Sequence, residues 1–386
     1  MTASSTSGST DLRSIRVEEL RPGASLEEFI ELQWRINAAD PHWVPPLRMA
    51  VRTALDRRKH PFHQHAEVAY FIARRDGPAV GRIAAIINRL HNDFHEDQVG
   101  FFGLFEAVDD VGVARALVDA AADWLRERGM VSMRGPVNFS TNEEISSPGV
   151  LVEGFARPPM AMMSHNPAYY DALLAATGLH KEKDLLAFWL DDPNPPQRLI
   201  RGMARVVERM DATIRPLDLK HFRREVDIVK AIYNSAWSRN WGFVPMTDAE
   251  FDHMANQLRP VVDPALCLIA EVKGEPVGFS LAIPNLNHAL RHLPSGRLFP
   301  FGLFRFLWHK RSIRGLRVLT LGFKPGFQQS GLGAALYLQS WMAGTARGYD
   351  HGEASWILED NLDMIRPLER MGAEPYRRYR IYQRPL

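Results

Sequence analysis

The sequence lacks several features that would place it in a specialised class of proteins. It has a single cysteine among 386 residues, so no disulfide can form within the chain. Cys267 stands in an apolar run, where we expect a small core side chain, because reactive thiols need electropositive and partly exposed surroundings. The absence of disulfides fits a reducing compartment such as the cytoplasm.

Long hydrophobic runs and a strong net charge are also missing. No segment approaches the roughly 18 apolar residues of a membrane-spanning helix, so we expect a chain that does not cross a membrane but could lie on one. The net charge of +2 argues against the whole chain being a polyanion binder. Residues 1–12 are small and polar and predict a disordered tail. We expect a cytoplasmic protein, with peripheral attachment to the inner membrane left open.

What the sequence does contain is an internal repeat. Residues 71–81 (FIARRDGPAVG) align without a gap with residues 268–278 (LIAEVKGEPVG). In each copy a short turn with glycine separates two apolar runs, which indicates a β-hairpin. A strand, a helix and another strand follow in both copies, and the helix of the first copy has an apolar stripe at helical spacing. The repeat predicts an α/β protein in which one mixed-sheet domain is written twice.

The boundary between the two copies is marked by composition. Residues 191–197 (DDPNPPQ) concentrate prolines and acidic residues, as linkers do. We therefore divide the chain into a first half at 13–190, a linker at 191–211 and a second half at 212–386.

The clearest chemical motif follows an apolar strand of the second half. The loop and helix start read KPGFQQSGLGA, with glycines that let main-chain amides approach a ligand closely. The helix that begins there adds the partial positive charge of its N-terminus, so the segment is suited to cradle a diphosphate. A plain glycine-rich helix start is the alternative. The cradle residues are Gln328, Gln329, Ser330, Gly331, Leu332, Gly333 and Ala334.

The spacing of Gln328, Gly331 and Gly333 resembles the acyl-CoA-binding motif of the GNAT (Gcn5-related N-acetyltransferase) superfamily. The resemblance implies two tandem GNAT-like domains and an acyl thioester, acyl-CoA or acyl-carrier protein, as co-substrate rather than a tightly bound cofactor. In that family the strands flanking the diphosphate helix splay apart, and the first offers backbone groups to the pantetheine. Carried over, the further donor-binding residues are Leu321, Gly322, Phe323 and Asn361.

The sequence also departs from the family pattern. Leu368 stands where many members keep a tyrosine that protonates the leaving thiolate, so Tyr379, Tyr382 or solvent would have to replace it. In the first half, Asp109 and Asp110 stand where the glycine loop should be. Carboxylates there cap a helix and repel a diphosphate, so we predict a degenerate first copy that shapes the acceptor site.

Attack of an amine on the thioester needs a base, because an ammonium group is not nucleophilic. Glu353 and Glu359 flank the strand after the diphosphate helix and are our candidates, although both could be solvated strand-end charges. We expect no metal site, since no cysteine or acidic residue completes the loose spacing of His60, His63 and His65.

Four residues are predicted to contact the acceptor. Trp241 and Phe243 lie in an aromatic loop of the second half and either line an apolar pocket or simply pack. The repeat aligns Asn285 and His288 with an identical asparagine and histidine of the first half. An acceptor amine and an acyl thioester are thus the partners that the sequence suggests, with no nucleic acid.

An insertion at 291–317 has no counterpart in the first half. It carries seven Lys and Arg, no Asp or Glu, and many bulky apolar residues, most of them within 295–313. This composition suits a membrane interface with anionic lipid or a long-chain substrate, while a core helix with outward arginines is the alternative. With the tandem arrangement, it is similar to the bacterial ceramide synthases, which N-acylate a sphingoid base. Acetyl transfer to a small amine, or acyl-CoA binding without catalysis, stays open.

Overall fold

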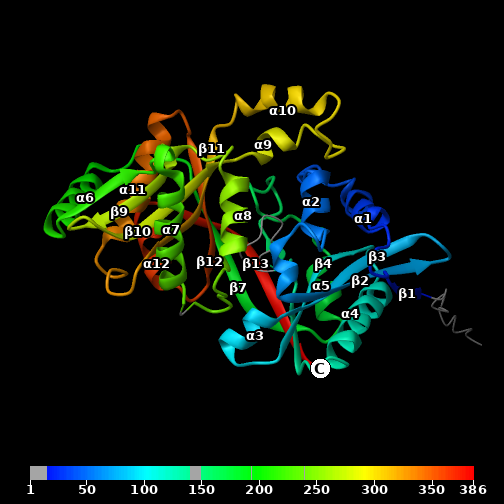
Figure 1. Cartoon of the computed structure of the whole chain (residues 1–386). Coiled ribbons are helices and arrows are strands. Elements are labelled where there is room, and N and C mark those ends of the chain that lie inside the picture. The colour runs from blue at the N-terminus through cyan, green and yellow to red at the C-terminus, as the bar shows by residue number, and fades with distance from the viewer. Residues whose placement is uncertain (1–14, 140–148, 193, 239) are drawn as a thin grey trace, which may run out of the picture.

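The computed structural model describes residues 15–139, 149–192, 194–238 and 240–386. The predicted tail at 1–12 lies outside the described residues. One continuous mixed sheet runs through the molecule, with helices on both of its faces (Figure 1). The strand order is β1-β2-β3-β4-β5-β13-β7-β12-β11-β10-β9-β8, and β6 pairs with β13. The predicted α/β class with mixed sheets is confirmed.

The elements of the first half are β1 Ile15–Glu19, α1 Glu27–Asn37, α2 Arg48–Leu55, β2 Ala66–Arg75, β3 Ala79–Asn88, α3 Arg89–His95, β4 Val99–Ala107, α4 Val111–Arg126, β5 Ser132–Gly135, β6 Val150–Glu153, α5 Tyr170–Ala175 and β7 His180–Leu190. Those of the second half are α6 Gln197–Arg209, β8 Ala212–Pro216, α7 Phe222–Ala236, α8 Asp248–Leu258, β9 Cys267–Val272, β10 Glu275–Pro284, α9 Asn287–Leu290, α10 Gly302–Lys310, β11 Gly315–Phe323, α11 Leu332–Ala346, β12 His351–Leu358, α12 Leu362–Arg370 and β13 Glu374–Pro385.

The repeated hairpins form β2–β3 and β9–β10. Their turns have the same backbone conformation, with positive φ at Asp76 (51°) and Gly77 (109°) and at Lys273 (51°) and Gly274 (79°). Two consecutive positive φ angles match the twist of antiparallel strands, and glycine adopts them without a steric cost. The hairpins predicted from the repeat are therefore present in both halves.

The last strand of each half pairs with strands of the other half. β7 is antiparallel to β12, with Glu353 opposite Trp189. β13 is antiparallel to β7 and, on its other side, to β5, with Tyr382 opposite Gly135. The red β13 accordingly runs into the first half in Figure 1. The chain boundary at 191–211 therefore does not coincide with a gap in the sheet.

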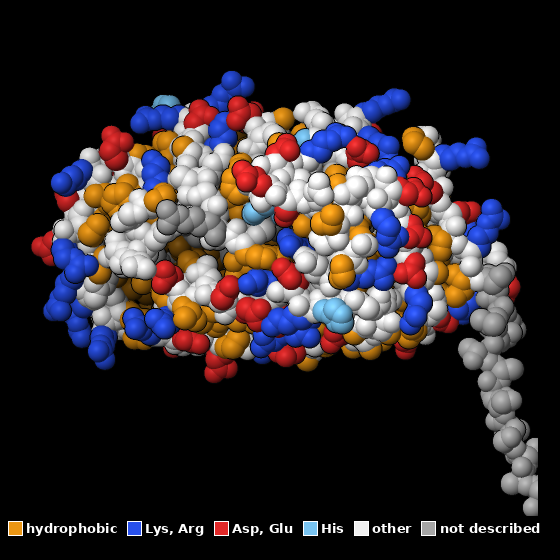
Figure 2. All heavy atoms as spheres, turned by 90° about the horizontal axis from the view of Figure 1, so that it is seen from below, with side chains coloured by type: hydrophobic (Ala, Val, Ile, Leu, Met, Phe, Trp, Pro, Cys, Tyr) orange, Lys and Arg blue, Asp and Glu red, His pale blue; other side chains and the backbone are white. Residues whose placement is uncertain are grey.

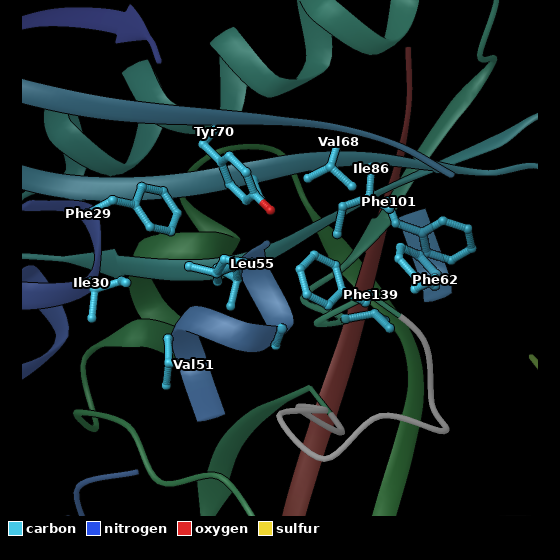
Figure 3. Close-up of a cluster of buried hydrophobic side chains, with 14 of the residues drawn as sticks. Phe29, Ile30, Val51, Leu55, Phe62, Val68, Tyr70, Ile86, Phe101 and Phe139 are labelled. Atoms are coloured by element: carbon cyan, nitrogen blue, oxygen red, sulfur yellow. The ribbon is translucent and has the colours of Figure 1, made fainter. Parts of the chain in front are cut away.

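Each half has its own hydrophobic core around this shared sheet. In the first half, side chains of α1 and α2 pack on one face of β2 and β3 (Figure 3), and α4 covers the other face. In the second half, α6, α11 and α12 contribute to a core with β11 and β12. Cys267 is a buried core residue, as predicted, and its burial raises the pKa of the thiol to about 12.

Among the helices of the described residues, none combines the length and the apolar composition that crossing a membrane demands.

Candidate active site

The central feature of the site is a divergence between β11 and β12. These parallel strands pair only from Gly315 with His351 to Val318 with Ala354. Beyond that point both strands line a cavity of about 690 Å³. The face seen in Figure 2 is hollowed over the second half, with hydrophobic side chains inside the hollow. This divergence is the splay that the family resemblance implies.

The glycine loop forms one wall of this cavity. Gly331 caps α11 with φ +87°, a left-handed conformation that favours glycine. The lining residues of the loop are Gln328, Gln329, Gly331, Gly333 and Ala334. The positive end of a 15-residue helix and its first amides thus face the cavity.

Two predicted cradle residues have internal roles instead. The Ser330 hydroxyl accepts a hydrogen bond from the Leu332 amide at 3.2 Å and donates one to the Phe327 carbonyl at 2.6 Å. The Leu332 side chain is fully buried in the second-half core. Neither residue lines the cavity. Both residues stabilise the conformation of the loop, and the other residues of the loop line the cavity.

The other predicted donor residues lie along the same cavity. Leu321, Gly322 and Phe323 line it from β11, and Asn361 lines it at the start of α12. A β-carbon added to Gly322 would lie 2.3 Å from the ring of Trp237. Glycine is therefore required here, because the indole of α7 packs directly on the strand.

Two arginines at the same cavity were not predicted. Arg366 and Arg370 line it from α12, one helical turn apart. Guanidinium groups bind phosphate oxygens through paired hydrogen bonds. The two arginines follow Asn361 in the sequence and are four residues apart, and this spacing on one helix is the signal that could have identified them.

Another part of the cavity lining is apolar. Trp241 and Phe243 line the cavity there, which is the first of the two alternatives that the sequence left open, and their contact with an acceptor stays a prediction. Further lining residues, from α7, α8 and the first half, are Met162, Val229, Tyr233, Phe251, Met254 and Leu258. The Trp241 ring also lies under the guanidinium of Arg134 at 5.0 Å and near the ammonium of Lys183 at 5.7 Å. These cations of the first half hold the indole at the border of the cavity.

Asn285 and His288 lie elsewhere. The main-chain amide of Asn285 donates to the Gly315 carbonyl at 2.9 Å, at the start of β11. The His288 ring contacts the Ser312 hydroxyl at 3.1 Å, at the base of the insertion. Neither residue lines the cavity. The predicted grouping of these two residues with Trp241 and Phe243 therefore does not correspond to one pocket.

A buried polar network lies at the floor of the splay. Glu353 is 1% exposed and accepts hydrogen bonds from the hydroxyls of Ser355 and Tyr376. Arg317 is equally buried and donates to the Ser355 hydroxyl at 2.8 Å. Ser355 and Arg317 line the cavity, and Glu353 lies directly behind them. A cavity-facing hydroxyl is thus backed by a carboxylate.

The charges of this network depend on one another. Burial lowers the pKa of the Arg317 guanidinium, and the Glu353 carboxylate 3.6 Å away opposes that shift. Burial and the same carboxylate raise the pKa of Tyr376, so its hydroxyl keeps its proton and donates it. Arg317, Ser355 and Tyr376 had no sequence signal, because their partners come from different strands.

The remaining catalytic candidates lie outside the cavity lining. Glu359 forms an ion pair with Lys181 at 2.7 Å and accepts from the Asp184 amide, which ties β7 to the end of β12. Tyr379 is fully buried on β13, where its hydroxyl donates to the Ser164 carbonyl at 3.2 Å. Leu368 is buried in the second-half core.

The corresponding place in the first half is closed. β4 and β5 also diverge, after Phe101, but the Val137 amide donates to the Phe102 carbonyl at 2.7 Å and fills the gap. The Asp110 carboxylate caps α4 by accepting from the Val113 amide at 3.0 Å, as predicted. Among its described residues, this half therefore has neither the open splay nor the glycine loop.

The described residues contain no group of three or more His, Cys, Asp or Glu side chains arranged to hold a metal ion. Among the three histidines with loose metal-like spacing, His63 contacts the Ala54 carbonyl at 3.0 Å. Burial lowers the pKa of His63 to about 4, so its ring is neutral near pH 7.

Comparisons with known proteins agree with this geometry. No family model matches the chain. The chain is 39% identical over 386 residues to the bacterial ceramide synthase of Caulobacter vibrioides, covering 96% of this chain and 98% of that protein. It is 38% identical over 369 residues to protein YghO of Escherichia coli, covering 94% and 93%.

Solved structures show the same fold at low sequence identity. A tandem GNAT protein from the clavulanic acid biosynthesis pathway has a TM-score of 0.56 at 14% identity, with 96% of this chain and 98% of that chain covered. A GCN5-related glucosamine N-acetyltransferase region of a fungal β-N-acetylglucosaminidase also reaches 0.56, at 15% identity, covering 96% of this chain and 38% of that one. The chain thus has the tandem GNAT fold and belongs to the family of the bacterial ceramide synthase.

Proposed function

We propose that this protein is an N-acyltransferase that moves a fatty acyl group from a thioester to the amine of a long-chain sphingoid base. One observation carries the proposal: a single cavity is lined by the glycine loop, by the splayed strands and by a set of apolar side chains. The relative in Caulobacter vibrioides is named a ceramide synthase. The glycine loop and the splayed strands suit an acyl thioester, and the apolar side chains suit the hydrocarbon chain of an amphiphilic amine.

The donor would enter at the loop. The amides at the start of α11 bind the diphosphate, and Arg366 and Arg370 meet its remaining phosphate charge. The pantetheine arm would lie between β11 and β12, where the pairing of these two strands ends at Val318 and Ala354. Acyl-CoA and acyl-carrier protein share this arm. We favour acyl-CoA, because the two arginines suit the additional phosphate of a free nucleotide.

The reaction joins the two ligands at the splay. The amine nitrogen attacks the thioester carbonyl carbon, a C–N bond forms, the C–S bond breaks, and the thiolate leaves with the donor. A main-chain amide of 319–323 stabilises the developing oxyanion. No covalent intermediate on the protein is needed.

The proton of the amine needs an acceptor at this point. We assign that role to Ser355, which passes its own proton to Glu353 as it takes one from the amine. Arg317 donates to the same hydroxyl at 2.8 Å and stabilises the negative charge of the pair. Glu353 is favoured over Glu359 because it accepts a hydrogen bond from Ser355, which lines the cavity, whereas Glu359 pairs with Lys181.

Substrate and product of this reaction are both amphiphiles. Such molecules reside in membranes, so we place the reaction at a membrane surface and the protein in peripheral contact with it. The acyl chain and the sphingoid chain would share the apolar wall around Trp241 and Phe243.

The test is a transfer assay with purified protein. Long-chain acyl-CoA is supplied with sphinganine or with ethanolamine, and both thiol release and the amide product are measured. Amide formation with sphinganine alone supports the proposal. Equal use of ethanolamine would favour a small-amine acetyltransferase, and donor binding without thiol release would favour a non-catalytic protein. Replacing acyl-CoA by acyl-carrier protein identifies the donor.

A further inference from the structure

The insertion before β11 exposes a concentrated apolar surface. Its side chains lie on α10 and in the loop before it, and α10 has no buried residue. Among the described residues, eleven large hydrophobic side chains are exposed, and five of them lie within ten residues of each other. These five, between 49% and 77% exposed, are Phe299, Phe301, Phe304, Leu307 and Trp308, and we call them the α10 patch.

The insertion is fixed to the first half of the molecule. Trp34 donates through its indole nitrogen to the Pro294 carbonyl at 3.1 Å. The Arg48 side chain donates to the Ser295 carbonyl at 2.7 Å, and the Arg48 amide donates to the Gly296 carbonyl at 2.9 Å. In Figure 1, α9 and α10 lie beside α2 at the edge of the molecule. The α10 patch therefore projects from a firm base, away from the sheet.

The charged side chains within the insertion have a single sign. Residues 291–317 include no Asp or Glu. Apart from the buried Arg317, the cations of this segment form no ion pair with any described residue. They are Arg291, Arg297, Arg305, Lys310, Arg311 and Arg314. Unpaired cations around exposed aromatic rings are complementary to anionic headgroups above an acyl layer.

We propose that the α10 patch docks on a bilayer that contains anionic phospholipid, with the aromatic side chains at the boundary between headgroups and acyl chains. A second copy of the chain is a poorer occupant, because a symmetric contact would bring the same cations face to face. An acidic protein would meet the cations but would leave the projecting aromatic rings without an apolar phase. The proposal does not depend on the acyl-transfer activity.

The geometry connects this surface to the cavity. α10 ends at Lys310, and β11 begins at Gly315 and lines the splay. The base of the insertion also contacts the first half next to the cavity, since Asn287 donates to the Met160 carbonyl at 2.9 Å and Met162 lines the cavity. Docking through α10 would thus hold the cavity close to the lipid surface.

The test is co-sedimentation of the full chain with vesicles of phosphatidylcholine alone and of phosphatidylcholine with phosphatidylglycerol. We expect binding to the anionic vesicles, about tenfold or more weaker for Phe301→Ser/Phe304→Ser/Trp308→Ser and for Arg305→Gln/Lys310→Gln/Arg311→Gln. The matched control Val111→Ser/Val131→Ser removes exposed apolar side chains elsewhere and should bind as the unaltered protein does.

Each other outcome overturns the proposal. Unchanged vesicle binding by the aromatic variant would show that the protein docks through another surface. No vesicle binding by the unaltered protein would show that it does not dock on such a bilayer. A dimer in solution that the aromatic variant dissolves would assign the patch to a second copy. Thiol release from acyl-CoA with a short-chain, soluble sphingoid base, or with micellar sphinganine, tests the proposed function separately, because neither assay needs a bilayer.

Discussion

Arg317 and Glu353 face each other one rung before the last paired rung between β11 and β12, with the guanidinium Nε 3.6 Å from the carboxylate Oε1. Both side chains are 1% exposed. The pair therefore stands where the strands begin to separate, under the cavity floor. A buried ion pair tolerates the loss of both partners better than the loss of one, because one partner alone leaves an uncompensated charge.

The first prediction concerns the stability of this pair. Arg317→Met should lower the free energy of unfolding by about 3–5 kcal/mol, since Glu353 would stay buried without its cation. The double variant Arg317→Met/Glu353→Met should lose clearly less free energy of unfolding than Arg317→Met does. Urea unfolding followed by circular dichroism measures both. Equal losses in the single and the double variant would mean that the two charges are not coupled.

The second prediction concerns proton transfer. Ser355→Ala and Glu353→Gln should each lower kcat by about 100-fold or more, while Ser355→Thr keeps a hydroxyl and should retain most of the activity. Glu359→Gln is the matched carboxylate control, because Glu359 pairs with Lys181 outside the cavity lining. Steady-state thiol release is the measurement. A larger loss in the Glu359 variant than in the Glu353 variant would reverse our assignment.

The third prediction concerns the glycine loop. Gly331 has φ +87°, which asparagine and aspartate tolerate better than other side chains do. Gly331→Asn and Gly331→Asp should therefore fold alike, but the added carboxylate should weaken acyl-CoA binding by about tenfold or more beyond the asparagine variant. Isothermal calorimetry separates the two. Equal affinities would place the diphosphate away from this helix start.

The fourth prediction concerns the contact between Gly322 and Trp237. Because an added β-carbon would lie 2.3 Å from the indole, Gly322→Ala should destabilise the protein by about 1–3 kcal/mol. Gly322→Ala/Trp237→Leu should recover part of this loss by making room. Thermal unfolding of the single and double variants measures the coupling. Additive losses would show that the glycine matters for another reason.

The fifth prediction concerns acid stability. Burial lowers the pKa of His91 to about 3, below its unfolded value of about 6.5. Between these two pKa values only the unfolded state binds the proton. The contribution of neutral His91 to the free energy of unfolding is therefore complete above pH 6.5 and is lost as the pH falls toward 3. We expect up to about 2 kcal/mol lost between pH 6.5 and 5. Urea unfolding at both pH values should show a smaller difference for His91→Gln, and an unchanged difference would exclude His91.

Much of the fold follows from patterns within a few residues. The two hairpins and the helix that follows in each half, α4 Val111–Arg126 and α11 Leu332–Ala346, were predicted from the repeat. Each depends on turn chemistry, a cap or an apolar stripe, and these act between neighbours in the chain. The glycine loop belongs to the same class, since its conformation is set by Gly331 itself.

The site required contacts between distant segments. Glu353 and Glu359 look equivalent in sequence, yet one is buried beside Arg317 and the other pairs with Lys181. Asn285 and His288 share the repeat with the first half but lie away from the cavity lining. Which carboxylate lies next to a lining hydroxyl is decided by strand pairing, and strand pairing is non-local.

The sequence by itself thus determined the repeated α/β unit, the glycine loop and the basic, aromatic insertion, because each is written in contiguous residues. Only the tertiary structure decided that β7 and β13 join one shared sheet and that the splay stays open in the second half alone. In the first half the Val137 amide closes the gap on β4. Such outcomes depend on which strand edges and loops meet in space, and spacing along the chain does not encode that.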